Sequence, residues 1–199
     1  MSENGKKALI RDAVRTRRAM LEPELVKYYG EVLSEQFLES DDEELVRDIK
    51  ACNCIAVYSS VRGEIPCDGI AKYFMDKGAT VCYPRVNGSE MEFYKVTDVD
   101  AQMTKGAYNI PEPNESATKV DSSEIDIMIV PAIAFNDEGI RLGQGGGYYD
   151  KYISKASSKG KVPLLVGACY DFQIYSALPV EAHDIAVDVI MCVYTGEDE

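Results

Sequence analysis

Apolar positions along the chain follow a helical period first and a strand period later. From residue 6 to residue 20 they recur at helical spacing, which predicts an amphipathic helix with one side on a core. A second helix is predicted over 22–40, where Pro23 suits the first turn. A short third helix is predicted over 41–50, capped by Asp41 or Asp42.

Short β-type runs follow, separated by turns or helices. They are "CIAVYS", "TVCYP", "MEFYKV", "IDIMIVP", "PLLVGACY" and "VDVIMCVY". A further helix, "CDGIAKYFMDKG", is expected to end at Gly78. The alternation predicts a single α/β domain over residues 1–199, with a doubly wound, largely parallel sheet flanked by helices in a Rossmann-like, three-layer arrangement. Residues 195–199 read as an acidic tail.

One face of the predicted first helix concentrates positive charge. Lys7, Arg11, Arg15 and Arg18 follow at steps of four, four and three, which stacks them along one side. Six of the 21 basic residues of the chain lie between positions 6 and 18. Two interpretations are open at this point, a solvated basic face and a ridge that binds an anion.

The overall charge limits the partners of the chain. A formal net charge of −13 argues against general binding to nucleic acid or to acidic membranes, which takes clustered Lys and Arg. The charged N-terminus and the lack of a run of ~20 apolar residues favour a cytoplasmic protein. The six cysteines show no CxxC pair, and the single histidine, His183, cannot complete a zinc cluster, so we expect reduced thiols. A monomer or weak homodimer is expected.

The stretch "RLGQGGGYYDKY", residues 141–152, combines backbone freedom with aromatic and acidic side chains. The preceding "AIAFNDEGIRLGQ" shows no obvious regular element. Three glycines then allow close approach of a ligand, and the helix predicted to begin at "YYDKYISKA" has free amide groups at its start. The loop is not a Walker A motif and does not match GxGxxG. A phosphate-binding loop and a flexible turn are both compatible with it.

Neighbouring side chains add candidate chemistry. Tyr148 and Tyr149 either offer flat faces to a planar heterocycle or pack into the sheet. Asp150 either caps the helix or holds Mg²⁺ against phosphate oxygens. Asp184, just before the last strand, is a possible second carboxylate, and Glu64 lies just past the first strand.

Taken together, these residues resemble the 5-formyltetrahydrofolate cyclo-ligase family, also called methenyltetrahydrofolate synthetases. The most specific block is "VPAIAFNDEGIRLGQGGGYYDKYI", and "KALIR", "GEI", "YPRV", "NIPEP" and "HDIAVD" occur in the family's order. The resemblance covers nearly the whole chain. It implies Mg²⁺- and ATP-dependent closure of 5-formyltetrahydrofolate to 5,10-methenyltetrahydrofolate through a phosphorylated formyl group, with release of ADP and phosphate.

The resemblance also implies residue roles. The implied catalytic residues are Arg141 and Tyr149. The implied nucleotide contacts are Lys7, Arg11, Arg141, Leu142, Gly143, Gln144, Gly145, Gly146, Gly147, Tyr148 and Tyr149. The implied folate contacts are Ser59, Glu64, Gln144, Gly145, Gly146, Gly147 and Tyr148. The implied metal ligands are Asp150 and Asp184.

One departure concerns the glycine loop. Some family members carry basic residues there, where this chain has Gln144 and Gly146, and a missing cation removes one stabiliser of transition-state charge. Arg141, Arg11 or Mg²⁺ is then expected to neutralise the phosphate. A phosphotransferase or isomerase of the same architecture acting on another small anion, and a formyl-folate binding protein, remain alternatives because fold does not fix function.

Overall fold

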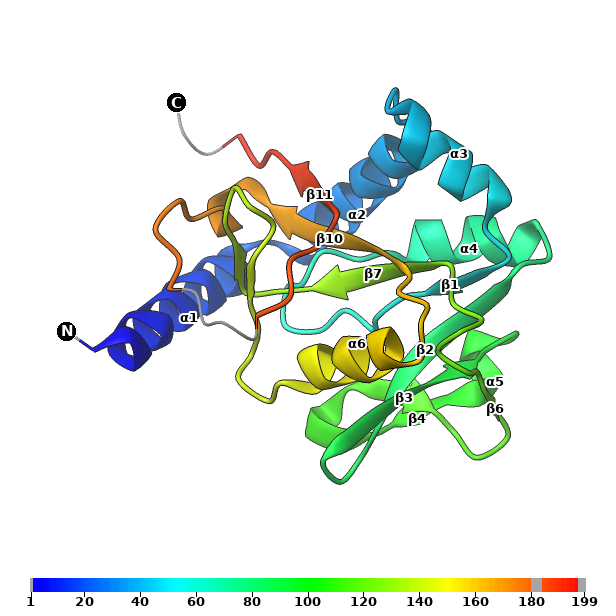
Figure 1. The fold of residues 1–199 in the computed structure, drawn as a ribbon. Helices are drawn as coiled ribbons and strands as arrows, with labels where there is room; N and C mark the ends of the chain where they lie inside the picture. Colours follow the sequence, from blue (N-terminus) through cyan, green and yellow to red (C-terminus); the bar gives the residue numbers. More distant parts are fainter. Residues whose placement is uncertain (1, 180–183, 197–199) are drawn as a thin grey trace.

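The computed structural model describes residues 2–179 and 184–196, which form a seven-stranded sheet between two layers of helices (Figure 1). The spatial order of the strands is β11–β10–β7–β1–β2–β3–β6. Their bounds are β1 Cys54–Ala56, β2 Thr80–Asn87, β3 Glu90–Lys95, β6 Thr118–Lys119, β7 Ile127–Pro131, β10 Leu164–Tyr170 and β11 Val189–Val193. The five strands from β11 to β2 run parallel, β3 pairs antiparallel with β2, and β6 pairs antiparallel with β3. The predicted α/β class with a largely parallel sheet is confirmed.

The predicted helices form, and their ends have identifiable causes. The longer helices are α1 Glu3–Met20, α2 Pro23–Leu38, α3 Glu43–Ala51, α4 Asp68–Asp76 and α6 Tyr148–Ser158, and α5 Val99–Gln102 is a single turn. Pro23 is the first residue of α2, where its missing N–H costs nothing. Asp42 caps α3, because its carboxylate accepts from the N–H groups of Glu44 and Leu45. Gly78 closes α4 with a φ of +79°.

Strand β7 shows why the sheet reads as continuous apolar runs. Its alternate residues enter two different cores, so both faces of the strand are buried. Ile127 and Ile129 join the cluster formed with α2, α3 and α4. Met128 and Val130 join the cluster formed with α6. The helices therefore cover both faces of the sheet, as predicted.

The order of the parallel strands makes a topological switch point between β1 and β7, and the region beyond the carboxyl ends of these two strands is here called the crevice. The chain leaves β1 towards β2 on one side and leaves β7 towards β10 on the other. The loops that follow these two strands therefore diverge, and ligands of doubly wound sheets bind at such a point. Helix α1 lies along this region, where Val14 packs with Ile133, Ala134 and Leu142 (Figure 1).

The prediction of no regular element before the glycine loop was wrong. Strands β8 (Ala134–Phe135) and β9 (Arg141–Leu142) pair antiparallel there. The turn between them depends on Asn136, whose side chain accepts from the N–H of Ile140, and on Gly139, which has a φ of +79°. Two-residue strands are too short to show a period of two, so only the turn residues signalled this hairpin.

Some smaller features were missed or lie beyond the described chain. A second small sheet pairs β4 (Met103–Lys105) with β5 (Pro111–Pro113) around the turn η1 (Ala107–Asn109). After β10 comes the short turn η2 (Asp171–Gln173). Most of the predicted acidic tail falls outside the described residues.

Two composition-based expectations can be examined in the structure. All six cysteines are free thiols, as expected, and Cys192 alone among them is not fully buried. In the part of the chain that the structure describes, none of the helices has the length and apolar content needed to cross a bilayer.

Candidate active site

The basic face of α1 points into the protein at the glycine loop. Arg11 donates from Nε to the carbonyl of Gly143 at 3.0 Å. Lys7 and Arg18 are buried, Arg11 is half-buried, and Arg15 is exposed. A purely solvated face would leave all four in water, so the structure favours the interpretation of this face as part of a site.

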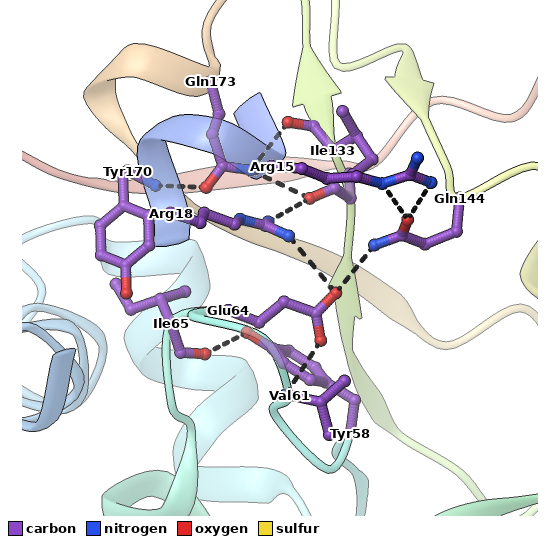
Figure 2. Close-up of polar contacts among 11 residues, drawn as sticks. Arg15, Arg18, Tyr58, Val61, Glu64, Ile65, Ile133, Gln144, Tyr170 and Gln173 are labelled. Carbon is purple, nitrogen blue, oxygen red and sulfur yellow. Dashed lines mark hydrogen bonds and ion pairs between the residues drawn. The ribbon is translucent and has the colours of Figure 1, made fainter. Parts of the chain in front are cut away.

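Arg18 forms an enclosed ion pair with Glu64 (Figure 2). Their Nη1 and Oε1 atoms are 3.4 Å apart, and the side chains are 2% and 10% exposed. Arg18 also donates from Nη2 to the carbonyl of Ala132 at 2.6 Å, and Gln173 donates to the same carbonyl at 2.9 Å. The start of the loop after β7 is thus tied to α1 and to η2.

Glu64 is held in place by a tight turn after β1. Arg62 and Gly63 both have positive φ, and the N–H of Val61 donates to Oε2 of Glu64 at 3.3 Å. Burial raises the pKa of Glu64, while Arg18, the N–H of Val61 and the amide of Gln144 act in the opposite direction. Both the protonation and the position of the Glu64 carboxylate therefore depend on Arg18, Val61 and Gln144.

Gln144 connects the glycine loop to both groups. Its Oε1 accepts from Nε and Nη2 of Arg15 at 3.3 and 2.8 Å, and its Nε2 donates to Oε1 of Glu64 at 3.4 Å (Figure 2). Predicted nucleotide and folate contacts from α1, from the loop after β1 and from the loop after β7 therefore meet at the crevice.

Arg141 and Asp150 form a second ion pair, in which only the arginine is enclosed. Nη2 of Arg141 lies 2.6 Å from Oδ1 of Asp150, and the Arg141 side chain is 3% exposed. Burial lowers the pKa of Arg141, and the negative charges of Asp150 and Asp184 oppose that shift. The ring of Tyr149 lies 5.7 Å from the Arg141 guanidinium carbon. Arg141, Tyr149 and Asp150 are thus brought together.

Helix α6 begins at this pair without a side-chain cap. Its N-cap is Gly147, with a φ of +65°, so the alternative that Asp150 caps the helix is wrong. Nothing within 3.4 Å would meet a Cβ at Gly145, which has a φ of +109°. The glycines here are required by backbone conformation, and they leave the first N–H groups of α6 open to an anion.

The two tyrosines after the loop have different surroundings. Tyr149 packs against Phe93 with ring centroids 6.5 Å apart, and burial raises its pKa. The hydroxyl of Tyr148 lies 3.3 Å from that of Tyr108, which is exposed, and donates to the carbonyl of Gly88 at 3.4 Å. Packing into the sheet therefore describes Tyr149, while Tyr148 stands at the outer side of the site.

Residues 3–193 match the model of the 5-formyltetrahydrofolate cyclo-ligase family. The chain belongs to this family.

Individual relatives and structures are similar over most of their length. The chain is 31% identical to a 5-formyltetrahydrofolate cyclo-ligase of Saccharomyces cerevisiae over 159 residues. This match covers 69% of this chain and 74% of the relative. It is 28% identical to a probable cyclo-ligase of Schizosaccharomyces pombe, over 87% of this chain and 92% of the relative. The NMR structure of Aquifex aeolicus 5,10-methenyltetrahydrofolate synthetase superposes with a TM-score of 0.74 at 32% identity, over 94% of this chain and 89% of that one.

Within this cyclo-ligase fold, the side chains of Ser59 and Leu142 contact groups outside the glycine loop. The hydroxyl of Ser59 donates to the carbonyl of Pro111 at 2.7 Å, which places it beside β5. The side chain of Leu142 is buried in the cluster with Val14, so only its backbone is available to a ligand. His183 lies outside the described residues.

Three residues make contacts around the site that the sequence did not indicate. Arg15 and Arg18 were recognised as part of the basic face but not as partners of Gln144 and Glu64. Gln173 is fully buried and ties η2 to Ala132, and a lone glutamine after a strand carries no signal in the sequence.

Proposed function

We propose that this member of the family closes 5-formyltetrahydrofolate to 5,10-methenyltetrahydrofolate with Mg²⁺-ATP, releasing ADP and phosphate. The observation that carries the proposal is the meeting of the basic face of α1, the glycine loop and Glu64 in one crevice. Cations and helix N–H groups lie there beside a buried carboxylate, in a chain that is acidic overall. The cations and N–H groups suit the phosphates of a nucleotide, and the carboxylate suits a substrate rich in N–H groups.

The proposed reaction has two steps. The formyl oxygen attacks the γ-phosphorus of ATP, and ADP leaves. The second amine of the substrate then attacks the activated formyl carbon and releases its proton to phosphate or solvent, and the phosphate leaves with the former formyl oxygen. Both steps require mainly that reactants be positioned and that charge on the moving phosphoryl group be neutralised.

The positions of the residues support the following proposed roles. Arg141 is nearly excluded from solvent and fixed by Asp150, so its charge is held at the start of α6 where phosphate oxygens would lie. Lys7, Arg11 and the glycine loop from Gly143 to Gly147 would hold the nucleotide. Tyr149 would pack under the reacting groups.

The folate side of the crevice is assigned separately. Glu64 would accept hydrogen bonds from the pterin. Ser59, Gln144 and Tyr148 would line the pocket around it.

The donor set fits Mg²⁺ in the presence of a nucleotide. Among the described residues there is no cluster of three or more His, Cys, Asp or Glu side chains that could hold a metal alone. Mg²⁺ usually takes one or two carboxylates together with phosphate and water oxygens, and Asp150 and Asp184 would be these carboxylates. When bound, the ion would supply positive charge to the phosphate oxygens.

The deciding experiment is to mix purified protein with 5-formyltetrahydrofolate and Mg²⁺-ATP and to follow the near-ultraviolet absorbance of the methenyl product. Omission of each component is the control. Product that requires all three, with one ADP formed per product, supports the proposal.

A matched pair of variants links the activity to this site. Arg141→Lys keeps the charge but loses the planar fork that pairs with Asp150, so kcat should fall by at least about tenfold. Arg47→Lys, on the exposed surface of α3, should leave kcat unchanged. Folded protein that binds ATP but forms no product would refute the cyclo-ligase proposal and point to another small anion or to a binding protein.

A further inference from the structure

Gln144 stands between a cation and an anion that do not touch each other. Its side-chain oxygen accepts two N–H groups of Arg15, and its side-chain nitrogen donates to Glu64 (Figure 2). The three residues come from α1, from the glycine loop and from the turn after β1. One amide therefore joins three segments that are far apart in the sequence.

The orientation of this amide is chemically forced. A guanidinium group can only donate hydrogen bonds, and an ionised carboxylate can only accept them. Rotating the Gln144 amide by half a turn would set donors against Arg15 and an acceptor against Glu64. A carboxylate at this position would suit Arg15 but not Glu64, and an ammonium group would suit Glu64 but not Arg15.

Glu64 depends on this contact because none of its other bonds is short. Its oxygens receive Nη1 of Arg18 at 3.4 Å, the N–H of Val61 at 3.3 Å and Nε2 of Gln144 at 3.4 Å. These distances are longer than the usual 2.7–3.2 Å, so no single donor fixes the carboxylate. Removing one of the three should let it turn.

We propose that Gln144 is a positioning residue for Glu64, oriented by Arg15, through which the glycine loop sets the affinity of the site for the folate substrate. The inference rests on the proposed function, since that function assigns the folate to Glu64. Gln144 acts here through Glu64 and needs no direct contact with the reacting atoms.

The principal test is Gln144→Glu, measured as KM for 5-formyltetrahydrofolate and for Mg²⁺-ATP. The introduced carboxylate still pairs with Arg15, so the loop should stay in place and the melting temperature should hold. It presents an acceptor to Glu64 in place of a donor. The folate KM should rise by at least about tenfold, the effect of losing a hydrogen bond to a charged group, while the ATP KM changes by no more than about threefold.

A double-mutant cycle separates this contact from a general charge effect. In the Glu64→Gln background the introduced amide at position 64 can donate to the introduced carboxylate at position 144, and the net charge equals that of the wild type. Gln144→Glu should therefore raise the folate KM by less than about threefold in that background. Gln36→Glu, on the exposed side of α2, makes the same charge change away from the site and should leave both KM values unchanged.

A second variant keeps the test decisive if Gln144→Glu does not fold. Arg15→Met releases the amide oxygen of Gln144, so the folate KM should rise by about threefold and the rise should disappear in the Glu64→Gln background.

If the wild-type protein forms product, three results would overturn the positioning role of Gln144. They are an unchanged folate KM, an ATP KM that rises as much as the folate KM, and equal effects of Gln144→Glu in both backgrounds. A wild type without any turnover would overturn the proposed function itself, and the assignment of Gln144 with it.

Discussion

Arg18 forms an ion pair with Glu64, and removing Arg18 should make the stability of the protein depend more strongly on pH. We consider Arg18→Met, which keeps a straight apolar side chain in the same enclosed space. The carbonyl of Ala132 loses the guanidinium but keeps the amide of Gln173 at 2.9 Å. The effect of the substitution therefore falls mainly on Glu64.

The size of the effect follows from the burial of both groups, which are 2% and 10% exposed in their side chains. Removing one partner of a buried pair costs about 3–5 kcal/mol in unfolding free energy while the other stays charged. Glu64 can instead take up a proton, since burial already raises its pKa. The loss should then shrink to about 1–2 kcal/mol, the contribution of the lost hydrogen bonds.

The sign of the pH dependence is fixed by that raised pKa. The native state holds the Glu64 proton more tightly than the unfolded chain, so stability falls as pH rises from the unfolded pKa to the native one. Arg18→Met raises the native pKa further. The difference between variant and wild type therefore grows with pH between the two native pKa values, by up to about 1.4 kcal/mol per pH unit.

The assay is urea unfolding followed by circular dichroism at about pH 5 and about pH 8, with linear extrapolation to water. Arg47→Met, on exposed α3, is the control and should change stability by less than about 0.5 kcal/mol at either pH. Adding Glu64→Gln to Arg18→Met should recover part of the loss at the higher pH only. An equal loss at both pH values would refute the reasoning, because it would show that Glu64 does not titrate in this range.

Three further predictions concern the metal and the turn after β1. Asp150→Asn keeps an acceptor for Arg141 but loses the charge for Mg²⁺, so kcat/KM for Mg²⁺-ATP should fall at least about 100-fold. Folate binding, measured by calorimetry, should change little. An unaltered kcat/KM would remove Asp150 from the metal site. Chelating Mg²⁺ should abolish turnover without changing the melting temperature of the nucleotide-free protein, and a large drop in that temperature would indicate a structural ion. Gly63→Ala should cost more stability than Gly78→Ala in urea unfolding. Both glycines have positive φ, but only at Gly63 would an added Cβ meet a backbone atom, the carbonyl oxygen of Arg18 at 2.7 Å. Equal losses of about 1 kcal/mol would mean that the backbone at Gly63 shifts freely.

Much of the fold was determined by local patterns that the sequence displays openly. The apolar runs of β7 and β10 predict strands that are buried on both faces. Pro23, Asp42 and Gly78 mark helix ends through a fixed φ, a capping carboxylate and a positive φ, respectively. The hairpin of β8 and β9 escaped because its strands are shorter than the period that would reveal them. Period and capping are properties of neighbouring residues, so a single chain suffices to read them.

The candidate site shows the same division. The charged face of α1 and the glycine loop could be recognised in the sequence, and the family resemblance implied the nucleotide and the folate as their ligands. Which cation meets which carboxylate was decided only by tertiary structure: Arg18 pairs with Glu64, and Arg141 pairs with Asp150.

The physical reason is the course of the chain through the sheet. The loops after β1 and β7 are far apart in sequence and are brought together only by the placement of β7 beside β1. The bridge by Gln144 exists because α1 crosses the same edge, within reach of the glycine loop. Spacing along the chain determined the elements, while the distances between atoms of different elements required the packed sheet.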